Sequence, residues 1–200
     1  MSNIKLNIKL IVGLANPGIK YELTRHNVGS WYIKLLAQKY KQILKLKSNF
    51  FGCIGKINLY GNSIYLFIPK IYMNFNGKAV LSLVNFYHIP PEKILVVHDE
   101  LNLIPGKAKI KFGGTNNGHN GLKDIQEKLG HNSNFYRLRI GIGHPGDKHK
   151  VIQFLLNKPT IQEQKLINIT IKEAIFCTEI LLNQGMHKAI NRLHSFKAFC

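Results

Sequence analysis

Leu10-Ile11-Val12-Gly13-Leu14 followed by Asn16-Pro17-Gly18 predicts a buried strand that closes in a turn. Thr24 is a favoured N-cap residue, so it predicts the start of a helix and places His26 in the first turn of that helix. In open α/β sheets, ligands bind where a strand ends and the next helix begins. A histidine titrates near neutral pH, so His26 is a candidate for proton transfer at this position.

The rest of the chain alternates between strand-like and helix-like stretches, which predicts one α/β domain over residues 1–200. We expect a twisted, mostly parallel sheet flanked by helices, made mixed by an antiparallel hairpin at Tyr60-Gly61-Asn62-Ser63. The predicted strands cover residues 8–13, 50–59, 64–68, 94–98, 107–112 and 137–142. The predicted helices cover residues 25–40, 76–87, 119–129, 147–157, 160–183 and 186–194.

The charge balance is strongly basic. The chain has 28 Lys and Arg against 10 Asp and Glu, a net charge of +18 over 200 residues. This excess indicates a polyanionic partner, and RNA or DNA fits better than a membrane because the sequence has no basic amphipathic anchor. A general bias toward Lys, Asn and Ile is the alternative origin of the charge.

The cysteines and the apolar runs bear on location. Cys53, Cys177 and Cys200 fit neither a disulfide framework nor a CxxC zinc site, so we expect a reducing, cytoplasmic environment. No apolar run approaches the roughly 18 residues that a membrane helix needs. We therefore expect no membrane partner.

Polar residues gather where four predicted elements end, in segments 16–26, 69–74, 98–101 and 113–121. Because the carboxyl ends of parallel strands share one edge, we expect these segments to line one crevice. There His26 can take a proton from water while Asp99 holds the imidazole. The uncharged amides of Asn16, Asn74 and Asn120 suit a substrate with amide and ester carbonyls, and one of them can stabilise an oxyanion.

Other catalytic templates match less well. No serine lies in a G-x-S-x-G pattern, and neither Gly13–Gly18 nor Gly113–Gly118 continues into the lysine of a phosphate loop. A metal site built from His26, His98, Asp99 and His119 stays open, although no spacing such as H-E-x-x-H supports it.

Structural roles compete with functional ones at single positions. Asn74 and Asn120 are also suited to cap helices without binding a ligand. His98 is interpreted as structural, because strand alternation is expected to point its side chain away from Asp99.

Five blocks of residues stand between about Ile11 and Pro159 in a fixed order and spacing. They are Gly13–Gly18 with Tyr21, Thr24–Asn27 and Gly29; Pro69 with Tyr72–Asn74 and Gly77; His98–Leu101 with Pro105–Lys107; Gly113-Gly114 with Gly118–Leu122; and Arg137–Pro145. Taken together, these blocks resemble the bacterial peptidyl-tRNA hydrolase family.

The resemblance implies a monomeric, cytoplasmic enzyme without metal or cofactor. It would hydrolyse the ester between the peptide and the 3′ end of tRNA in peptidyl-tRNA, which recycles tRNA from aborted translation. By resemblance, His26 would activate water, Asp99 would stabilise its productive form, and Asn16 would separate N-blocked from free aminoacyl substrates. Residues that would contact the peptidyl-tRNA end are Tyr21, Tyr72, Met73, Asn74 and Asn120. Candidate phosphate contacts are Lys107, Lys109, Lys111 and Arg139.

The chain departs from the family pattern at six positions, which are Asn76, Asn102, Ile104, Thr115, Asn116 and Asn117. These departures affect the expected loop geometry and binding strength but none of the residues assigned to chemistry. Two rival functions are a non-catalytic RNA-binding relative and a small-ester hydrolase. The presence of His26 and Asp99 argues against the first, and the basic charge argues against the second.

Overall fold

The computed structural model describes residues 6–199. In this part of the chain, seven strands form one mixed sheet in the order β2-β3-β4-β1-β5-β7-β6. The four central strands β4, β1, β5 and β7 are parallel, whereas β2, β3 and β6 run antiparallel to their neighbours. The predicted mixed α/β sheet is confirmed, with the parallel pairing confined to its centre.

The elements match the predicted ones closely in order. The strands are β1 (Leu10–Gly13), β2 (Lys45–Lys47), β3 (Gly52–Leu59), β4 (Asn62–Pro69), β5 (Ile94–Glu100), β6 (Ala108–Phe112) and β7 (Tyr136–Gly141). The α-helices are α1 (Val28–Lys39), α2 (Asn76–Phe86), α3 (Asn120–Lys128), α4 (Val151–Leu156), α5 (Ile161–Gln184) and α6 (Met186–Ser195).

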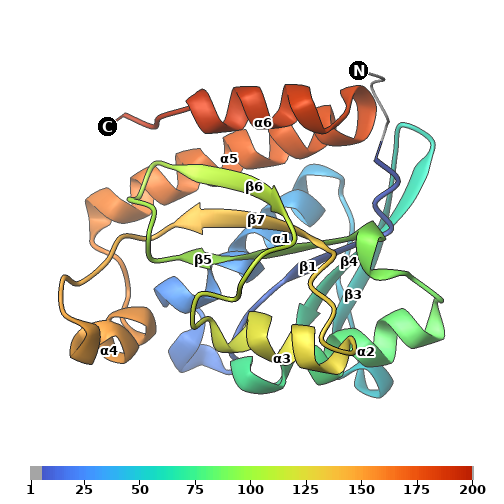
Figure 1. Ribbon diagram of the computed structural model, residues 1–200, viewed down its shortest axis with the longest axis horizontal. Helices are drawn as coiled ribbons and strands as arrows, with labels where there is room; N and C mark the ends of the chain where they lie inside the picture. The colour runs from blue at the N-terminus through green and yellow to red at the C-terminus, as the bar shows by residue number, and fades with distance from the viewer. Residues whose placement is uncertain (1–5, 200) are drawn as a thin grey trace.

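Helices cover both faces of the sheet (Figure 1). Side chains of α1, α5 and α6 pack on one face, together with Ile11 of β1 and Leu95 of β5. Side chains of α2 and α3 pack on the other face, against Val12 and Val96. Neighbouring residues of β1 and β5 thus enter opposite cores, which explains why both strands read as continuous apolar runs.

A close backbone approach joins β1 to the start of α1. A Cβ atom on Gly13 would lie 2.2 Å from the carbonyl oxygen of Gly29, and one on Gly29 would lie 2.4 Å from the carbonyl oxygen of Val97. Only glycine permits this approach at both positions. It brings the start of α1, and with it His26, directly against the carboxyl ends of β1 and β5.

The hairpin between β3 and β4 is tighter than predicted. Its turn consists of Tyr60 and Gly61 alone, because Asn62 already pairs with Leu59 in the ladder. Both turn residues have positive φ angles, 48° and 77°, as a two-residue type I′ turn requires.

The helix start predicted at Thr24 is wrong in its details. The Oγ1 atom of Thr24 donates to the carbonyl of Tyr21 and caps no helix. Arg25–Asn27 instead form a 3₁₀ turn, η2, and α1 begins only at Val28. His26 therefore lies in the turn before the helix.

Two strands also differ from the prediction. β5 continues through Asp99 and Glu100, because β7 keeps pairing with it as far as Gly141. β2 was not predicted, since its three residues are all exposed and give no apolar alternation. β6 lies at an edge of the sheet, as its alternating basic and apolar residues predict.

Candidate active site

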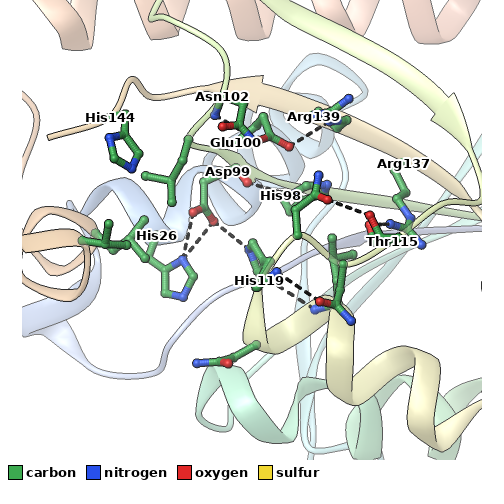
Figure 2. A pocket seen from close by; sticks show the side chains of 18 of the residues that line it. His26, His98, Asp99, Glu100, Asn102, Thr115, His119, Arg137, Arg139 and His144 are labelled. Carbon is green, nitrogen blue, oxygen red and sulfur yellow. Dashed lines mark hydrogen bonds and ion pairs between the residues drawn. The ribbon is translucent and has the colours of Figure 1, made fainter. Parts of the chain in front are cut away.

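A histidine–carboxylate pair lies at the carboxyl edge of the sheet. The Nδ1 atom of His26 in η2 is 3.0 Å from both carboxylate oxygens of Asp99, at the end of β5 (Figure 2). Both residues are buried, at 7% and 3% exposure. Asp99 accepts at Nδ1, so the imidazole carries its proton there and leaves the lone pair of Nε2 available as a base.

Asp99 is held by a second histidine, which the sequence analysis named only as a possible metal ligand. The Nε2 atom of His119 lies 3.0 Å from Oδ1 of Asp99. The Nδ1 atom of His119 accepts from the backbone N–H of Leu122 as the N-cap of α3. This cap leaves the Nε2–H of His119 to donate to the carboxylate. His119, and not Asn120, therefore caps this helix.

The electrostatics of the pair suit a base. Burial lowers the pKa of His26, but the charge of Asp99 and the hydrogen bond to it outweigh burial and raise this pKa above 6.5. Burial raises the pKa of Asp99, yet the charges and hydrogen bonds of His26 and His119 hold it well below its usual range. Asp99 is therefore ionised at every pH at which His26 titrates.

His98 stays close to Asp99, contrary to the expectation from strand alternation. Its Nδ1 atom donates to the carbonyl oxygen of Asp99 at 2.7 Å, and its ring packs edge-on against the ring of His119. Burial and the neighbouring His119 lower the pKa of His98 to about 3, so this ring is neutral near pH 7. These contacts support the interpretation of His98 as a structural residue.

A cavity of about 320 Å³ opens beside the pair. His26, Asp99 and Asn120 line it, which brings three of the sequence-predicted site residues together. Lys111 and Arg139 line it as well, so basic side chains and the base face one space. Among the described lining residues there is no serine or cysteine to act as a nucleophile.

Two asparagine side chains form hydrogen bonds with the backbone just after β1. The side chain of Asn27 accepts from the N–H of Asn16 and donates to its carbonyl, at 2.8 and 3.0 Å. The side chain of Asn76 is fully buried; it accepts from the N–H of Ala15 and donates to the carbonyl of Ala15. It also donates to the carbonyls of Ile71 and Tyr72. Asn76 therefore connects the end of β1 with the segment after β4.

Asn16 is linked to the segment after β4 rather than to the main cavity. Its Oδ1 atom accepts from the N–H of Met73 at 2.8 Å, which leaves the Nδ2 donor free for other partners. Asn16 lines a smaller pocket of about 170 Å³. Met73 in turn packs against Gly121, since a Cβ atom there would lie 2.6 Å from its sulfur. These contacts connect Asn16 with the start of α3.

The two tyrosines predicted to contact the peptidyl-tRNA end lie close to each other. The rings of Tyr21 and Tyr72 are 6.5 Å apart in an edge-to-face arrangement. Asn74 is exposed in the 3₁₀ turn η4 (Met73–Phe75) and does not line the main cavity. The structure thus groups Tyr21, Tyr72, Asn16 and Asn74 around η4, and groups His26, Asp99 and Asn120 around the cavity.

The basic candidates differ in their surroundings. Lys109 and Lys111 are exposed on one face of β6 and pair in register with Arg139 and Arg137 of β7. The Nε of Arg139 donates to Glu100 at 2.8 Å, so this guanidinium already has a counter-ion. Lys107 precedes β6 and does not line the cavity.

Arg137 supports the glycine-rich loop and was not among the predicted site residues. Its guanidinium is buried and donates to the carbonyls of Gly114 and Thr115. Burial and the nearby Arg139 lower the pKa of Arg137 to about 10. In the same loop Asn117 has a φ of 49°, a left-handed conformation that asparagine tolerates.

Three ligand atoms could hold a metal ion. They belong to His26, Asp99 and His119 and lie within 4.8 Å of one another. A metal bound there would displace the hydrogen bonds of Asp99 with both rings.

In the described residues, no helix is both long and apolar enough to span a membrane.

The fold and the site together indicate a class of protein. A buried imidazole, held by a carboxylate at the carboxyl edge of an open α/β sheet, can supply general-base chemistry to a bound ligand. The peptidyl-tRNA hydrolase family model matches residues 10–199. The chain belongs to the peptidyl-tRNA hydrolase family.

Individual relatives agree over nearly the full length. The curated peptidyl-tRNA hydrolase of Proteus mirabilis is 63% identical over 191 residues, and that of Yersinia pseudotuberculosis is 62% identical over 192 residues. Each alignment covers 96% of this chain and 98% of the relative. The crystal structure of peptidyl-tRNA hydrolase from Acinetobacter baumannii is similar with a TM-score of 0.92 at 42% identity, over 98% of this chain and 99% of that one.

Proposed function

We propose that this chain hydrolyses the ester bond between the peptide and the 3′ end of tRNA in peptidyl-tRNA, with a water molecule activated by His26. One observation carries the mechanism: Asp99 holds the Nδ1 side of a buried imidazole beside a cavity that basic residues also line. An ester is hydrolysed more easily than a peptide bond, so an activated water suffices. No covalent nucleophile is needed.

In the proposed reaction, Nε2 of His26 takes a proton from water as the oxygen attacks the ester carbonyl carbon. The positive charge that forms on the imidazole is stabilised by Asp99, which stays ionised. The proton then passes to the departing ribose oxygen, so the products are tRNA and a peptide carboxylic acid, which loses its remaining water proton to solvent and becomes the carboxylate. His119 keeps the carboxylate in place for both steps.

The amide side chains are proposed to bind groups that every peptide shares. Asn16 offers Nδ2, because Oδ1 is already used by Met73. This donor suits a carbonyl of an N-blocked substrate, which a free aminoacyl end lacks. Asn120 at the cavity is our candidate for the developing oxyanion, where one donor contributes about 2.7–4 kcal/mol. Tyr21, Tyr72, Met73 and Asn74 would contact the acyl and terminal nucleotide portions.

Lys107, Lys109, Lys111 and Arg139 are proposed to contact tRNA phosphates. Such contacts are independent of sequence and weaken as salt rises. If about three phosphates are neutralised, the slope of log affinity against log salt is expected to be about −2 to −3. We further propose that residues 1–200 form one domain and that the protein acts as a cytoplasmic monomer without a metal or other cofactor.

Incubation of the purified protein with N-acetyl-aminoacyl-tRNA tests this function. We expect release of tRNA at the same rate with and without EDTA, and much slower release from free aminoacyl-tRNA. A small ester such as p-nitrophenyl acetate should be a poor substrate, because it engages neither the amides nor the basic face. Failure to cleave the N-blocked substrate would contradict the proposed function, whereas loss of activity in EDTA would contradict metal independence alone.

The phosphate contacts predict an effect on binding rather than on chemistry. The double substitution Lys109→Glu with Lys111→Glu should raise KM more than it lowers kcat, and should flatten the salt slope by about 0.7–0.9 for each lost contact. Lys45→Glu with Lys47→Glu is the matched control, since it makes the same charge change on exposed residues of the opposite edge strand β2. Equal effects of the two doubles, or a change in kcat alone, would refute the assignment.

A further inference from the structure

A buried arginine precedes the proposed base and forms hydrogen bonds with residues between 154 and 163. The side chain of Arg25 in η2 is 7% exposed. Its Nη1 atom donates to the carbonyls of Phe154, Asn157 and Lys158 at 3.3, 3.3 and 2.9 Å. Its Nη2 atom pairs with Glu163 at 2.7 Å.

Two further contacts strengthen this connection. The guanidinium carbon of Arg25 lies 4.0 Å from the centre of the Phe154 ring. The backbone N–H of Arg25 donates to the carbonyl of Asn157. Phe154 lies in the last turn of α4, where its carbonyl also accepts from the N–H of Asn157, and Asn157 and Lys158 follow the helix. A cation at this end also suits the helix dipole. Arg25 therefore fastens the carboxyl end of α4 and the two residues after it.

Helix α4 is only partly buried. None of its six residues is fully buried, and Phe154 and Leu155 pack against the hydrophobic core that α1, α5 and α6 share. In Figure 1 it lies away from the strands of the sheet. Yet Val151 and Leu155 of α4 line the same cavity as His26. Part of the wall of the cavity thus belongs to a helix that is hydrogen-bonded to Arg25, the residue before the proposed base.

We propose that Arg25 is a positioning residue, which holds α4 as the wall of the cavity and so sets the binding of the acyl end of the substrate. Arg25 touches neither Asp99 nor the cavity in this structure, so it acts through α4. The kinetic part of this inference rests on the proposed function, and the structural part does not.

Arg25→Lys is the first test. Lysine keeps the charge but lacks the planar fork that serves four acceptors at once. We expect amide hydrogen exchange in residues 151–158 to accelerate at least about tenfold, the factor that one lost charge-assisted hydrogen bond supplies. KM for N-acetyl-aminoacyl-tRNA should rise about tenfold on the same grounds, with kcat and its pH profile retained.

Glu163→Gln is a second, milder variant. Its amide oxygen can still accept from the N–H of Thr160 and keep the capping box at the start of α5, while the charge opposite Arg25 is lost. We expect the same changes in exchange and KM, smaller in size. Because the capping box survives, this variant keeps the test open if Arg25→Lys does not fold.

Arg192→Lys is the matched control. Arg192 also pairs with a glutamate, Glu173, and stacks on a ring, Phe176, but it has no bond to α4. A purely structural role for Arg25 would instead raise exchange across the whole chain and lower the melting temperature, with KM unchanged. Unchanged exchange in residues 151–158 together with unchanged KM would overturn the inference. A wild-type protein that cleaves no peptidyl-tRNA would refute the proposed function but leave the exchange result standing.

Discussion

His26→Ala is expected to lower kcat for N-acetyl-aminoacyl-tRNA by about 10²–10⁴-fold, the contribution of a positioned general base. The alanine removes the only group that we assign to take a proton from water. Asp99 remains held by His119, so the cavity should keep its shape. The affinity for deacylated tRNA should therefore match that of the wild type, as measured by filter binding at one fixed salt concentration.

A second histidine provides the control for this variant. His131 is exposed in the turn after α3 and has a φ of 59°, which asparagine tolerates. His131→Asn should leave both kcat and tRNA affinity unchanged. If His26→Ala turned over substrate as fast as His131→Asn, His26 would not be the base. If it lost tRNA affinity as well, the site would have collapsed and the loss of kcat would say nothing about proton transfer.

Asp99→Asn should be almost as damaging although it changes only one atom. Asp99 accepts from both His26 and His119, and a neutral amide has a single oxygen. With the amide oxygen at the Oδ1 position, His119 keeps its acceptor, and the NH₂ group takes the Oδ2 position, which is also 3.0 Å from Nδ1 of His26. An NH₂ group there donates best to an unprotonated Nδ1, so the change favours the His26 tautomer that carries its proton on Nε2 and cannot act as the base. In a serine protease the corresponding change costs about 10⁴ in kcat.

The rival interpretation of a non-catalytic RNA-binding protein makes the opposite prediction for both variants. Neither His26 nor Asp99 is needed to bind phosphates, and both are buried. Ionised Asp99 would also repel a polyanion slightly. A buried carboxylate between two imidazoles is costly to maintain unless a charge has to be stabilised beside it.

Much of the site followed from the sequence, because one topological rule applies to it. Strand ends in a parallel sheet share an edge, so His26 after β1 and Asp99 at the end of β5 had to be close. Gly13 and Gly29 belong to the same pattern, but their role as the contact between β1 and α1 is visible only in three dimensions.

Other features left no signal in the sequence. The bond of His119 to Asp99 depends on a loop conformation, and the capping role of the same ring excludes the predicted cap at Asn120. Asn27 and Asn76 form hydrogen bonds with the backbone of Asn16 and Ala15. Side chains that bond to backbone groups follow no periodic sequence pattern, so the sequence does not reveal these bonds. The bonds of Arg25 join residues more than 120 positions apart, and only the assembled chain places them together.

The pH dependence of kcat/KM tests the central claim most directly, since it reports the ionisation of the base in the free enzyme. A base must be neutral to accept a proton, so activity should fall on the acid side as His26 becomes protonated. Because Asp99 raises the pKa of His26, the acid limb of the wild type should have its midpoint above 6.5. In Asp99→Asn that midpoint should shift to lower pH, since burial then acts alone. Superimposable profiles for the two proteins would contradict the account.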